Sequence, residues 1–236
     1  RWLGIMLQVK DGNYFYKKKG RKKEQTFLYN NDINFTLQPG EILSILGPNG
    51  AGKTTMLKCI MGLFKWERGE TLLDGKVLSK MPQKDVWKII GYVPQASKMT
   101  FSYSILDLVT MGRAVYIGAF QQPSQKDRDA AREALELVGI SHLADQPCTA
   151  VSGGELQLAL IARTLVAEPK ILVLDEPFSG LDPVNTEVLK NIILELINEG
   201  KYIVMSSHQM TSIEEFCSEV LILNKGKTVL QGNLNE

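Results

Sequence analysis

One loop constrains the fold of this chain more than any other part of its sequence. Its residues, Gly47-Pro48-Asn49-Gly50-Ala51-Gly52-Lys53-Thr54-Thr55, match the pattern G-x-x-x-x-G-K-[ST]. The apolar residues 41–46 before it predict a buried strand, and a helix is expected from about Gly52. Glycines let backbone N–H groups curl around an anion at the positive end of that helix. The loop therefore predicts a phosphate site, in which Lys53 reaches the β- and γ-phosphates and Thr54 ligates Mg²⁺.

Further apolar runs predict the rest of an α/β fold. Residues 171–174, 202–205 and 220–223 are short, apolar and alternate with helical patterns such as 184–197. Strands that alternate with helices indicate a parallel sheet covered on both faces. Residues 97–168 interrupt this order with helices expected around 104–111, 126–138 and 154–166 and no strand between them. They predict a helical insertion in the α/β core.

The N-terminal residues 7–37 predict short antiparallel strands that flank the basic run 17–23. Six basic residues in this run could bind nucleic acid or a membrane surface. A solvated hairpin tip is the favoured interpretation, because Lys+Arg 27 and Asp+Glu 26 give the chain a net charge of only +1. The same balance excludes a strongly basic nucleic-acid coat and an acidic tail protein.

Composition places the chain among cytosolic globular proteins. Its 236 residues can bury a sizeable core without covalent staples. Cys59, Cys148 and Cys217 show no metal-ligand spacing and indicate a reducing compartment. No apolar run approaches the roughly 18 residues of a membrane span, and no signal peptide is visible, so we expect that the chain is not itself a membrane protein. It begins with Arg1, so trimmed ends are expected.

Acidic residues follow the apolar run 171–174. Asp175 and Glu176 are expected at the carboxyl end of a parallel strand, where α/β folds bind ligands. Asp175 would hold Mg²⁺ and Glu176 would polarise an attacking water, with the metal offsetting the repulsion between the two charges. The alternative is a pair of acids that cap the next turn, and the phosphate loop makes this alternative the weaker one.

Two polar motifs have good structural explanations of their own. Ser152-Gly153-Gly154-Glu155 reads as a capping box, although its glycines also suit a phosphate that approaches a helix start. Asp182 before Pro183 reads as an N-cap. His208 and Gln95 each end a predicted strand and carry little signal alone.

Taken in order along the chain, these motifs resemble those of the nucleotide-binding subunits of ABC transporters. The matching residues are the phosphate loop 47–55, the Q-loop Gln95, the signature Ser152-Gly153-Gly154, Asp175-Glu176, the D-loop 179–182 and the H-loop His208. Tyr16 stands where the family has an aromatic residue that stacks on adenine. The resemblance covers nearly the whole chain. It implies one ATPase domain, a P-loop NTPase (RecA-like) α/β fold with an N-terminal antiparallel β subdomain. Residues 1–95 and 169–236 would form that subdomain and the core, and 96–168 the inserted α-helical subdomain.

The resemblance also implies a mechanism that uses ATP and Mg²⁺. Two subunits would pair head to tail, with each ATP between one phosphate loop and the partner's Ser152-Gly153-Gly154. Glu176 would act as general base, and His208 would hold it and the γ-phosphate in line. Gln95 would sense the water and Mg²⁺, as a metal ligand beside Thr54 and Asp175. Asp182 would communicate across the dimer.

The implied partners are a second copy of the chain, membrane permease subunits and an extracytoplasmic substrate-binding protein, with no nucleic acid. The implied location is the cytoplasmic face of a prokaryotic cell membrane. Residues 92–95 and 105–113 resemble importers of iron–siderophore complexes, haem and cobalamin. Residues 207–210, 214–217 and 222–227 instead resemble drug or sodium exporters. The importer resemblance is the favoured interpretation, and an exporter subunit is the alternative.

ABC ATPases that work without a permease are a further alternative. Chromosome-maintenance types need hundreds of residues between the phosphate loop and the signature, and here Lys53 and Ser152 are 99 positions apart. Translation types usually carry two cassettes in one chain. An iron–sulfur assembly ATPase remains compatible with the length. A kinase with the same loop does not explain Ser152-Gly153-Gly154.

This sequence departs from the family pattern beside the signature. Val151 replaces the usual Leu, and Leu158 stands where the family usually has Arg. The loss of Arg removes a charge-assisted contact, which puts the rate or the stability of the closed dimer in doubt. Importer subunits of this type also often continue beyond the position of Glu236, so a missing C-terminal piece is expected.

Overall fold

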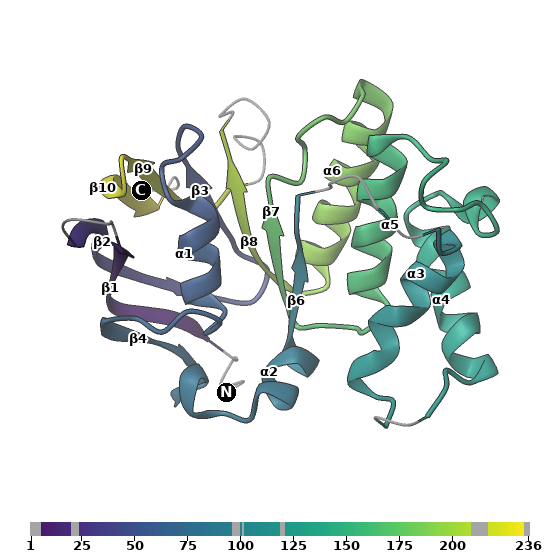
Figure 1. Ribbon diagram of the computed structural model, residues 1–236, viewed down its shortest axis with the longest axis horizontal. Helices are drawn as coiled ribbons and strands as arrows, with labels where there is room; N and C mark the ends of the chain where they lie inside the picture. Colours follow the sequence, from purple (N-terminus) through teal and green to yellow (C-terminus); the bar gives the residue numbers. More distant parts are fainter. Residues whose placement is uncertain are drawn as a thin grey trace. The chain divides into compact units, whose positions relative to one another are not determined.

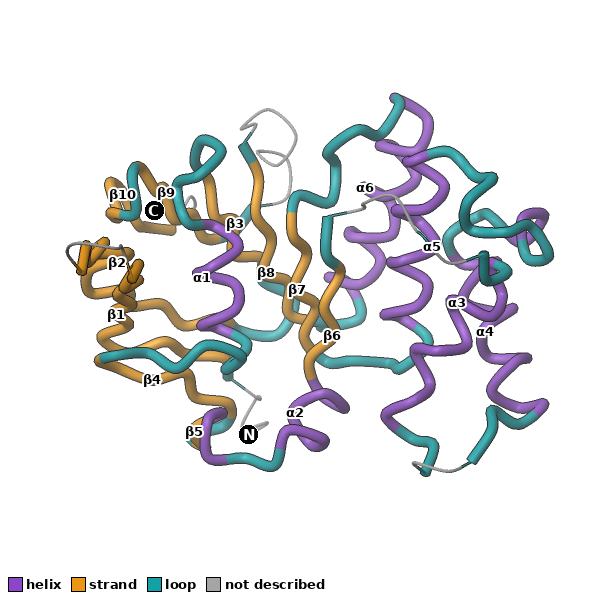
Figure 2. Tube along the Cα trace, in the orientation of Figure 1, coloured by secondary structure: helices purple, strands orange, loops and turns teal. Residues whose placement is uncertain are grey.

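The computed structural model describes residues 6–19, 24–95, 100, 102–118, 121–208 and 217–233, with the side chains of residues 15–31 left aside. The chain divides into two compact units. Figures 1 and 2 show the helices and strands that belong to each unit. The first unit comprises Arg1–Pro82 and Glu199–Glu236, and the second comprises Gln83–Asn198. Each unit is described by itself.

The first unit begins with an antiparallel sheet. Its strands lie in the order β2 (Glu24–Leu37), β1 (Leu7–Lys19), β4 (Arg68–Leu73) and β5 (Lys76–Val77). In β2, buried Ile33, Phe35 and Leu37 alternate with exposed residues, which is the pattern of a sheet with one buried face. The predicted hairpin of β1 and β2 is confirmed, but its strands are long rather than short.

The remaining strands of the first unit lie in the order β10 (Lys227–Asn233), β9 (Glu219–Asn224), β3 (Ile42–Leu46) and β8 (Tyr202–Ser207). β3 pairs in parallel with both β8 and β9, and β10 pairs antiparallel with β9. Every residue of β3 and of β8 is buried, as expected for parallel strands covered on both faces. Helix α1 (Lys53–Ile60) follows β3, as predicted.

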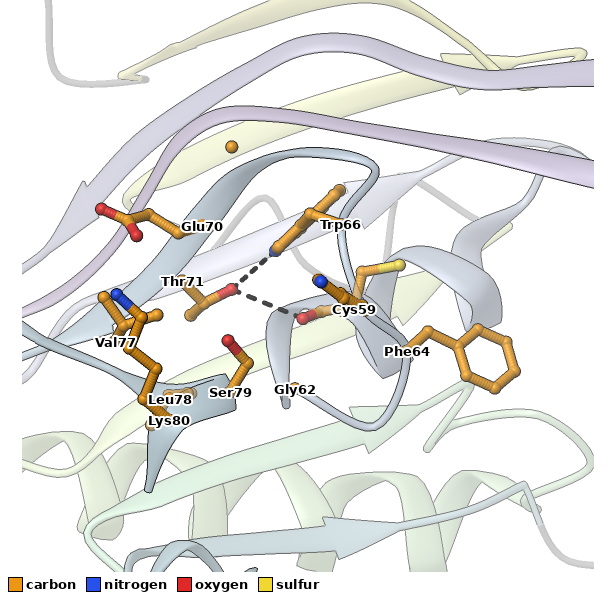
Figure 3. Close-up of a pocket in the computed structure, with 12 residues that line it drawn as sticks. Cys59, Gly62, Phe64, Trp66, Glu70, Thr71, Val77, Leu78, Ser79 and Lys80 are labelled. Carbon is orange, nitrogen blue, oxygen red and sulfur yellow. Dashed lines mark hydrogen bonds between the residues drawn. The ribbon is translucent and has the colours of Figure 1, made fainter. Parts of the chain in front are cut away.

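The end of α1 is tied to the antiparallel sheet by buried polar groups (Figure 3). The Trp66 Nε1–H donates to Thr71 Oγ1 at 2.9 Å, and the Thr71 hydroxyl donates to the Cys59 carbonyl at 3.4 Å. They border a pocket of about 170 Å³ whose lining residues, among them Phe64, Glu70 and Lys80, all belong to the first unit. This volume is below the roughly 300 Å³ at which ordinary ligand sites begin. The pocket is therefore too small for a nucleotide.

The second unit contains a parallel pair of strands and a group of helices. β6 (Ile90–Val93) pairs with β7 (Ile171–Asp175). The predicted helices are α3 (Ile105–Thr110), α4 (Gln125–Leu137) and α5 (Gly153–Leu165), which pack on one another. The unit also contains α2 (Gln83–Ile89) and α6 (Pro183–Asn198). Short 3-10 helices occur at Leu78–Lys80 in the first unit, and at Met111–Val115 and Ser141–Leu143 in the second.

Helix α6 begins one residue before the predicted range 184–197. Its buried residues lie in the later part of this range. They are Leu189, Ile192, Ile193 and Leu196, whereas Val184, at the start of the predicted helical range, is 73% exposed. The first turn of α6 is therefore held by its cap rather than by apolar packing.

Cys59, Cys148 and Cys217 are free and buried. Within the described ranges, no helix combines the length and the apolar character that crossing a membrane requires.

We predict that Gly69→Ala destabilises the first unit more than Gly75→Ala does. Both glycines have positive φ, 88° and 71°, so an alanine costs about 1–2 kcal/mol at either position. At Gly69 an added Cβ would also lie 2.3 Å from the Asp11 carbonyl oxygen, whereas at Gly75 no described atom lies within 4 Å. Overpacking of this kind costs about 1–3 kcal/mol more. Urea unfolding of the two variants measures the difference, and equal losses would contradict the close approach of Gly69 to β1.

Candidate functional site

The phosphate loop of the first unit is curled around the ammonium group of its own lysine. Lys53 Nζ donates to the Gly47 carbonyl at 2.7 Å and to the Pro48 carbonyl at 3.2 Å, and Lys53 is 6% exposed. A backbone bond from Ala51 N–H to the Pro48 carbonyl, at 3.0 Å, closes the turn inside the loop. The loop therefore holds a desolvated positive charge, which suits it to bind an anion.

Helix α1 starts without a cap of its own. Its N-cap is Gly52, with φ 100° and ψ 11°, and no side chain in the described part of the chain caps it. No acidic residue stands in its first turn either. The first N–H groups of a helix have no partner inside the helix and carry its positive end. This start is therefore suited to a phosphate group, with the exposed Thr54 beside it.

The H-loop histidine lies next to the start of the phosphate loop. Leu46 of β3 pairs with Ser207 of β8, and the Gly47 N–H donates to the Ser207 carbonyl at 3.2 Å. His208, which is exposed, is the next residue. Parallel pairing thus brings the predicted phosphate loop and the predicted histidine together in one unit.

The predicted adenine-stacking residue lies mostly outside what can be described. Tyr16 belongs to β1, but its side chain falls among the residues left aside. The nearby Tyr14 ring stacks on Phe64, with ring centroids 5.7 Å apart, and Lys58 Nζ lies 5.4 Å from the centroid of the Phe64 ring. The Tyr14 ring therefore packs against Phe64.

In the second unit, Asp175 ends β7 and Glu176 follows it, both buried, at 4% and 9% exposure. Glu176 has φ 49° and precedes Pro177, a left-handed conformation that costs about 1–3 kcal/mol in a residue other than glycine. The same conformation occurs at the exposed Glu168, with φ 51°, so the burial of Glu176 at the end of β7, rather than its φ, distinguishes it as a candidate site residue.

Tyr92 is a site residue that the sequence did not single out. Its hydroxyl donates to Asp175 Oδ2 at 3.3 Å. Burial, and then the negative charge of Asp175 and this hydrogen bond, raise the pKa of Tyr92, so the phenol keeps its proton and remains a donor. A tyrosine inside an apolar strand reads as a packing residue, and only strand pairing reveals the contact.

The Q-loop and the D-loop meet in the second unit. Gln95 Nε2 donates to Ser179 Oγ at 3.1 Å. Asp182 caps α6, as predicted: its Oδ1 accepts from the Asn185 backbone N–H at 2.9 Å, and its Oδ2 accepts from Asn185 Nδ2 at 2.6 Å. The backbone bond from Asn185 lowers the pKa of Asp182.

The signature motif forms the predicted capping box at the start of α5. Ser152 Oγ accepts from the Glu155 N–H at 3.2 Å, and Glu155 Oε2 accepts from the Ser152 N–H at 2.7 Å. The two glycines inside it differ. A Cβ on Gly154 would lie 2.8 Å from Asn185 Nδ2, whereas none of the described atoms lies within 4 Å of a Cβ on Gly153. The close contact with Asn185 thus explains why position 154 is a glycine. At the exposed Gly153, the lack of a side chain leaves the backbone accessible to a ligand.

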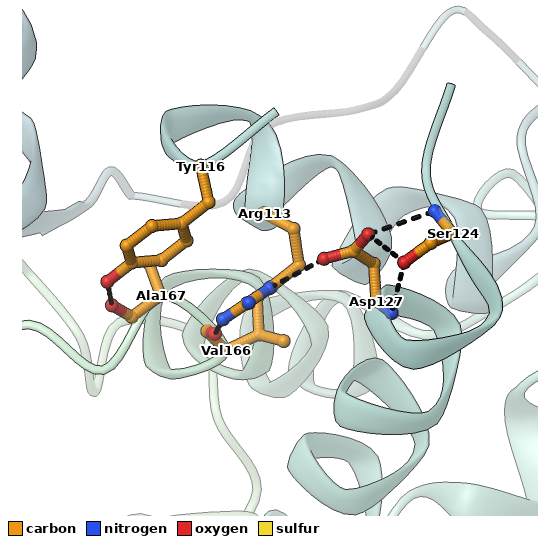
Figure 4. A network of polar contacts seen from close by, with 6 residues as sticks. All are labelled: Arg113, Tyr116, Ser124, Asp127, Val166 and Ala167. Carbon is orange, nitrogen blue, oxygen red and sulfur yellow. Dashed lines mark hydrogen bonds and ion pairs between the residues drawn. The ribbon is translucent and has the colours of Figure 1, made fainter. Parts of the chain in front are cut away.

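The other end of α5 is held by charged and aromatic groups (Figure 4). Arg113 Nη1 donates to the Val166 carbonyl at 3.0 Å, and the Tyr116 hydroxyl donates to the Ala167 carbonyl at 2.7 Å. Arg113 also pairs with Asp127, Nε to Oδ1, at 3.0 Å. The signature helix is therefore fixed at both ends. Leu158, where the family pattern has Arg, is buried in this helix, with 1% exposure.

The residues predicted to hold Mg²⁺ are Thr54, Gln95 and Asp175. A hydroxyl, an amide oxygen and a carboxylate are the hard oxygen donors that Mg²⁺ takes, together with substrate phosphates. The described residues contain no cluster of three or more His, Cys, Asp or Glu side chains that could hold a metal. With only one carboxylate among its three members, the predicted donor set suits a metal that arrives with a phosphate.

Comparison with known proteins agrees with this chemistry. A family model described as ABC transporter matches residues 30–179. The molybdate import ATP-binding protein MolC of Haemophilus influenzae is 34% identical over 93% of this chain and 79% of its own. The manganese transport system ATP-binding protein MntA of Synechocystis is 37% identical over 89% and 79%. The lipopolysaccharide export system ATP-binding protein LptB of H. influenzae is 34% identical over 85% and 83%.

Solved structures share the fold. A chain of an inward-facing ABC transporter described as metal-chelate type superposes with a TM-score of 0.81 and 32% identity, over 97% of this chain and 83% of that one. A dimeric ATP-binding cassette, MJ0796, with bound ADP and phosphate has a TM-score of 0.82 and 26% identity, over 97% and 98%.

We predict that Asp127→Asn destabilises the protein in a pH-dependent way. Hydrogen bonds from Ser124, and then from Arg113, lower the pKa of Asp127 to about 2. The carboxylate therefore contributes stability fully above its ordinary pKa of about 4 and loses it as the pH falls towards 2. The difference in free energy of unfolding between wild type and variant should shrink over this interval, measured by urea unfolding from pH 7 to pH 2.

Asp129→Asn is the matched control. Asp129 pairs with Arg132 at 3.6 Å, and both side chains are more than half exposed, so the pair contributes little. A pH-independent difference for Asp127→Asn would contradict the assigned role of its charge.

Proposed function

We propose that this chain, which belongs to the ABC transporter family and is an ATP-hydrolysing subunit of such a transporter, powers the import of a metal-containing substrate. The start of α1 carries the proposal. Its N–H groups have no side-chain cap among the described residues, and Lys53 is buried beside them, so a phosphate would supply what the helix lacks.

In this proposal the first unit binds the nucleotide. Residues 47–55 cradle the phosphates through backbone N–H groups, Lys53 turns from its own loop carbonyls to the β- and γ-phosphates, and Tyr16 stacks on adenine. His208 lies close enough in the fold to the loop to contact the γ-phosphate, because Ser207 is bonded to Gly47. The Gly47 and Pro48 carbonyls would then lose the ammonium group of Lys53 as a hydrogen-bond partner. The new bonds between Lys53 and the phosphates would offset this loss.

The second unit supplies the acids. Glu176, which is buried directly after β7, accepts a proton from the attacking water. Asp175, Thr54 and Gln95 would hold Mg²⁺, which when bound neutralises charge on the phosphate oxygens. The bond from Gln95 to Ser179 keeps the Q-loop amide in a defined place until it engages the metal and the water.

A second copy of the chain would complete the site. Ser152 and Gly153 are exposed, so a partner's nucleotide can reach them, and the structure of the MJ0796 cassette is a dimer. Asp182 would contact the partner, in addition to capping α6. The remaining partners in the proposal are permease subunits and an extracytoplasmic binding protein, at the cytoplasmic face of a prokaryotic membrane.

The proposed division of the chain assigns residues 1–95 and 169–236 to the β subdomain and the ATP-binding core. Residues 96–168 form the helical subdomain that faces the permease.

The proposed cargo is a metal chelate such as an iron–siderophore, haem or cobalamin. The similarity to a metal-chelate type transporter supports it, as does the motif at residues 105–113. The molybdate relative, an import protein, supports import more broadly, and the manganese relative, a transport protein, supports a metal as the substrate. The likeness to LptB keeps an exporter subunit as the second candidate. Isolation of the membrane subunit that co-purifies with this chain, followed by uptake assays with labelled chelates, tests the choice.

We predict that Glu176→Gln binds ATP but hydrolyses it at least about 100-fold more slowly, because the amide cannot accept the proton of the water. Release of phosphate and binding of a fluorescent ATP analogue measure the two properties. Glu168→Gln is the matched control, since Glu168 is an exposed glutamate with φ 51° in the same unit. Turnover by the Glu176 variant at the wild-type rate would remove it from the role of base.

We predict that Lys53→Ala weakens ATP binding by about tenfold or more, because it deletes charge-assisted hydrogen bonds to the phosphates. Isothermal titration with ATP measures this affinity. Lys58→Ala, in the same helix but directed at Phe64, should keep the wild-type affinity. An unchanged affinity of the Lys53 variant would overturn the assignment of the phosphate loop.

A further inference from the structure

We infer that Tyr92 is a positioning residue that links the signature helix α5 to the metal-binding carboxylate of Asp175. This inference rests on the proposed function, since it assumes that Asp175 holds Mg²⁺ beside ATP. It adds a residue that lies outside the signature, the phosphate loop and the acidic pair.

The pairing of β6 with β7 explains why Tyr92 reaches Asp175. In this parallel pair Tyr92 stands beside Val173, and Asp175 lies two residues further along β7. Side chains two residues apart point to the same face of a sheet, so the long tyrosine side chain can extend along β7 to the carboxylate. The hydroxyl oxygen and Asp175 Oδ2 are 3.3 Å apart. The contact joins a half-buried phenol to a carboxylate that is 4% exposed.

The backbone of Tyr92 is bonded to α5 at the same time. The Thr164 hydroxyl, on the last turns of α5, lies 3.3 Å from the Tyr92 carbonyl oxygen and 3.0 Å from that of Leu160. The neighbouring Gly91 allows this approach, because a Cβ there would lie 2.4 Å from Thr164 Cγ2. Helix α5 therefore rests directly on β6 at Tyr92, with one hydroxyl shared between its own backbone and the strand.

These contacts form one continuous connection, from Thr164 of the signature helix, through Tyr92, to Asp175. A hydrogen bond from an outer residue fixes the orientation of a carboxylate that ligates a metal, and removal of such a partner typically weakens metal binding by about 10- to 100-fold. A shift of α5 along β6 would move the Tyr92 carbonyl and hydroxyl together. Tyr92 thus makes the orientation of the carboxylate depend on the position of the helix that carries Ser152-Gly153-Gly154.

Tyr92→Phe tests the inference, because it removes the hydroxyl and keeps the ring. With the purified full chain and a non-hydrolysable ATP analogue, we expect the affinity for Mn²⁺, followed by electron paramagnetic resonance, to fall about tenfold. The free Mg²⁺ needed for half-maximal ATP hydrolysis should rise by a similar factor. Binding of ATP without metal should match the wild type, since the phosphate loop is untouched.

Two further variants separate positioning from stability. Tyr116→Phe also deletes a hydroxyl that is bonded in the second unit, to the Ala167 carbonyl at 2.7 Å, and should lower thermal stability while leaving metal affinity unchanged. Thr164→Val removes the bond to the Tyr92 carbonyl and should weaken Mn²⁺ binding in the same direction as Tyr92→Phe, but by less.

The outcomes distinguish this inference from the proposed function. Wild-type Mn²⁺ affinity in Tyr92→Phe, while the wild-type chain hydrolyses ATP with Mg²⁺, overturns the role of Tyr92 alone. Equal losses of metal affinity in Tyr92→Phe and Tyr116→Phe also overturn it, because they would indicate a general loss of structure. A wild-type chain without Mg²⁺-dependent ATP hydrolysis would overturn the proposed function and the inference with it.

Discussion

Parallel strand pairing is the constraint on which the placement of the site residues depends. Parallel neighbours end at the same edge of a sheet, so residues that follow different strands come together there. In the first unit this edge joins Gly47 to Ser207 and places His208 beside the phosphate loop. In the second unit it places Tyr92 beside the strand that ends in Asp175. Which site residues come together in each unit thus depends on the pairing of the backbone strands. The types of the side chains alone do not specify this pairing.

Local patterns predicted much of the fold and most of the candidate site. The strands β3, β7, β8 and β9 each contain a short, mostly apolar run, and the loop after β3 has the spacing G-x-x-x-x-G-K-[ST]. The capping box at Ser152 and the N-cap at Asp182 could be predicted because a cap depends on residues three positions apart. Such features are encoded within a few residues of sequence.

Features that depend on distant residues could not be predicted in this way. β4 and β10 were missed, since Arg68-Gly69-Glu70 and the polar residues of an edge strand give no apolar run. The contact of Tyr92 with Asp175 needs the register of two strands whose paired residues are 81 positions apart in sequence, Gly91 beside Leu172 and Tyr92 beside Val173. Gly154 was interpreted through a ligand alone, but its approach to Asn185 shows that the packing of α5 on α6 already requires a small residue there.

The helix starts show why the nucleotide belongs at α1. Side chains cap α3 through Ser104, α4 through Ser124, α5 through Ser152 and α6 through Asp182. Helix α1 instead begins at Gly52, where the described residues offer no such oxygen. Relative to a Ser or Asp cap, a Gly cap costs a helix only about a few tenths of a kcal/mol, so the fold loses little stability when the first turn of α1 has no side-chain cap. A bound phosphate would satisfy those N–H groups, and a ligand that binds only the folded state stabilises it in proportion to its affinity. The uncapped N–H groups at the start of α1 therefore affect both the stability of the helix and its affinity for the nucleotide.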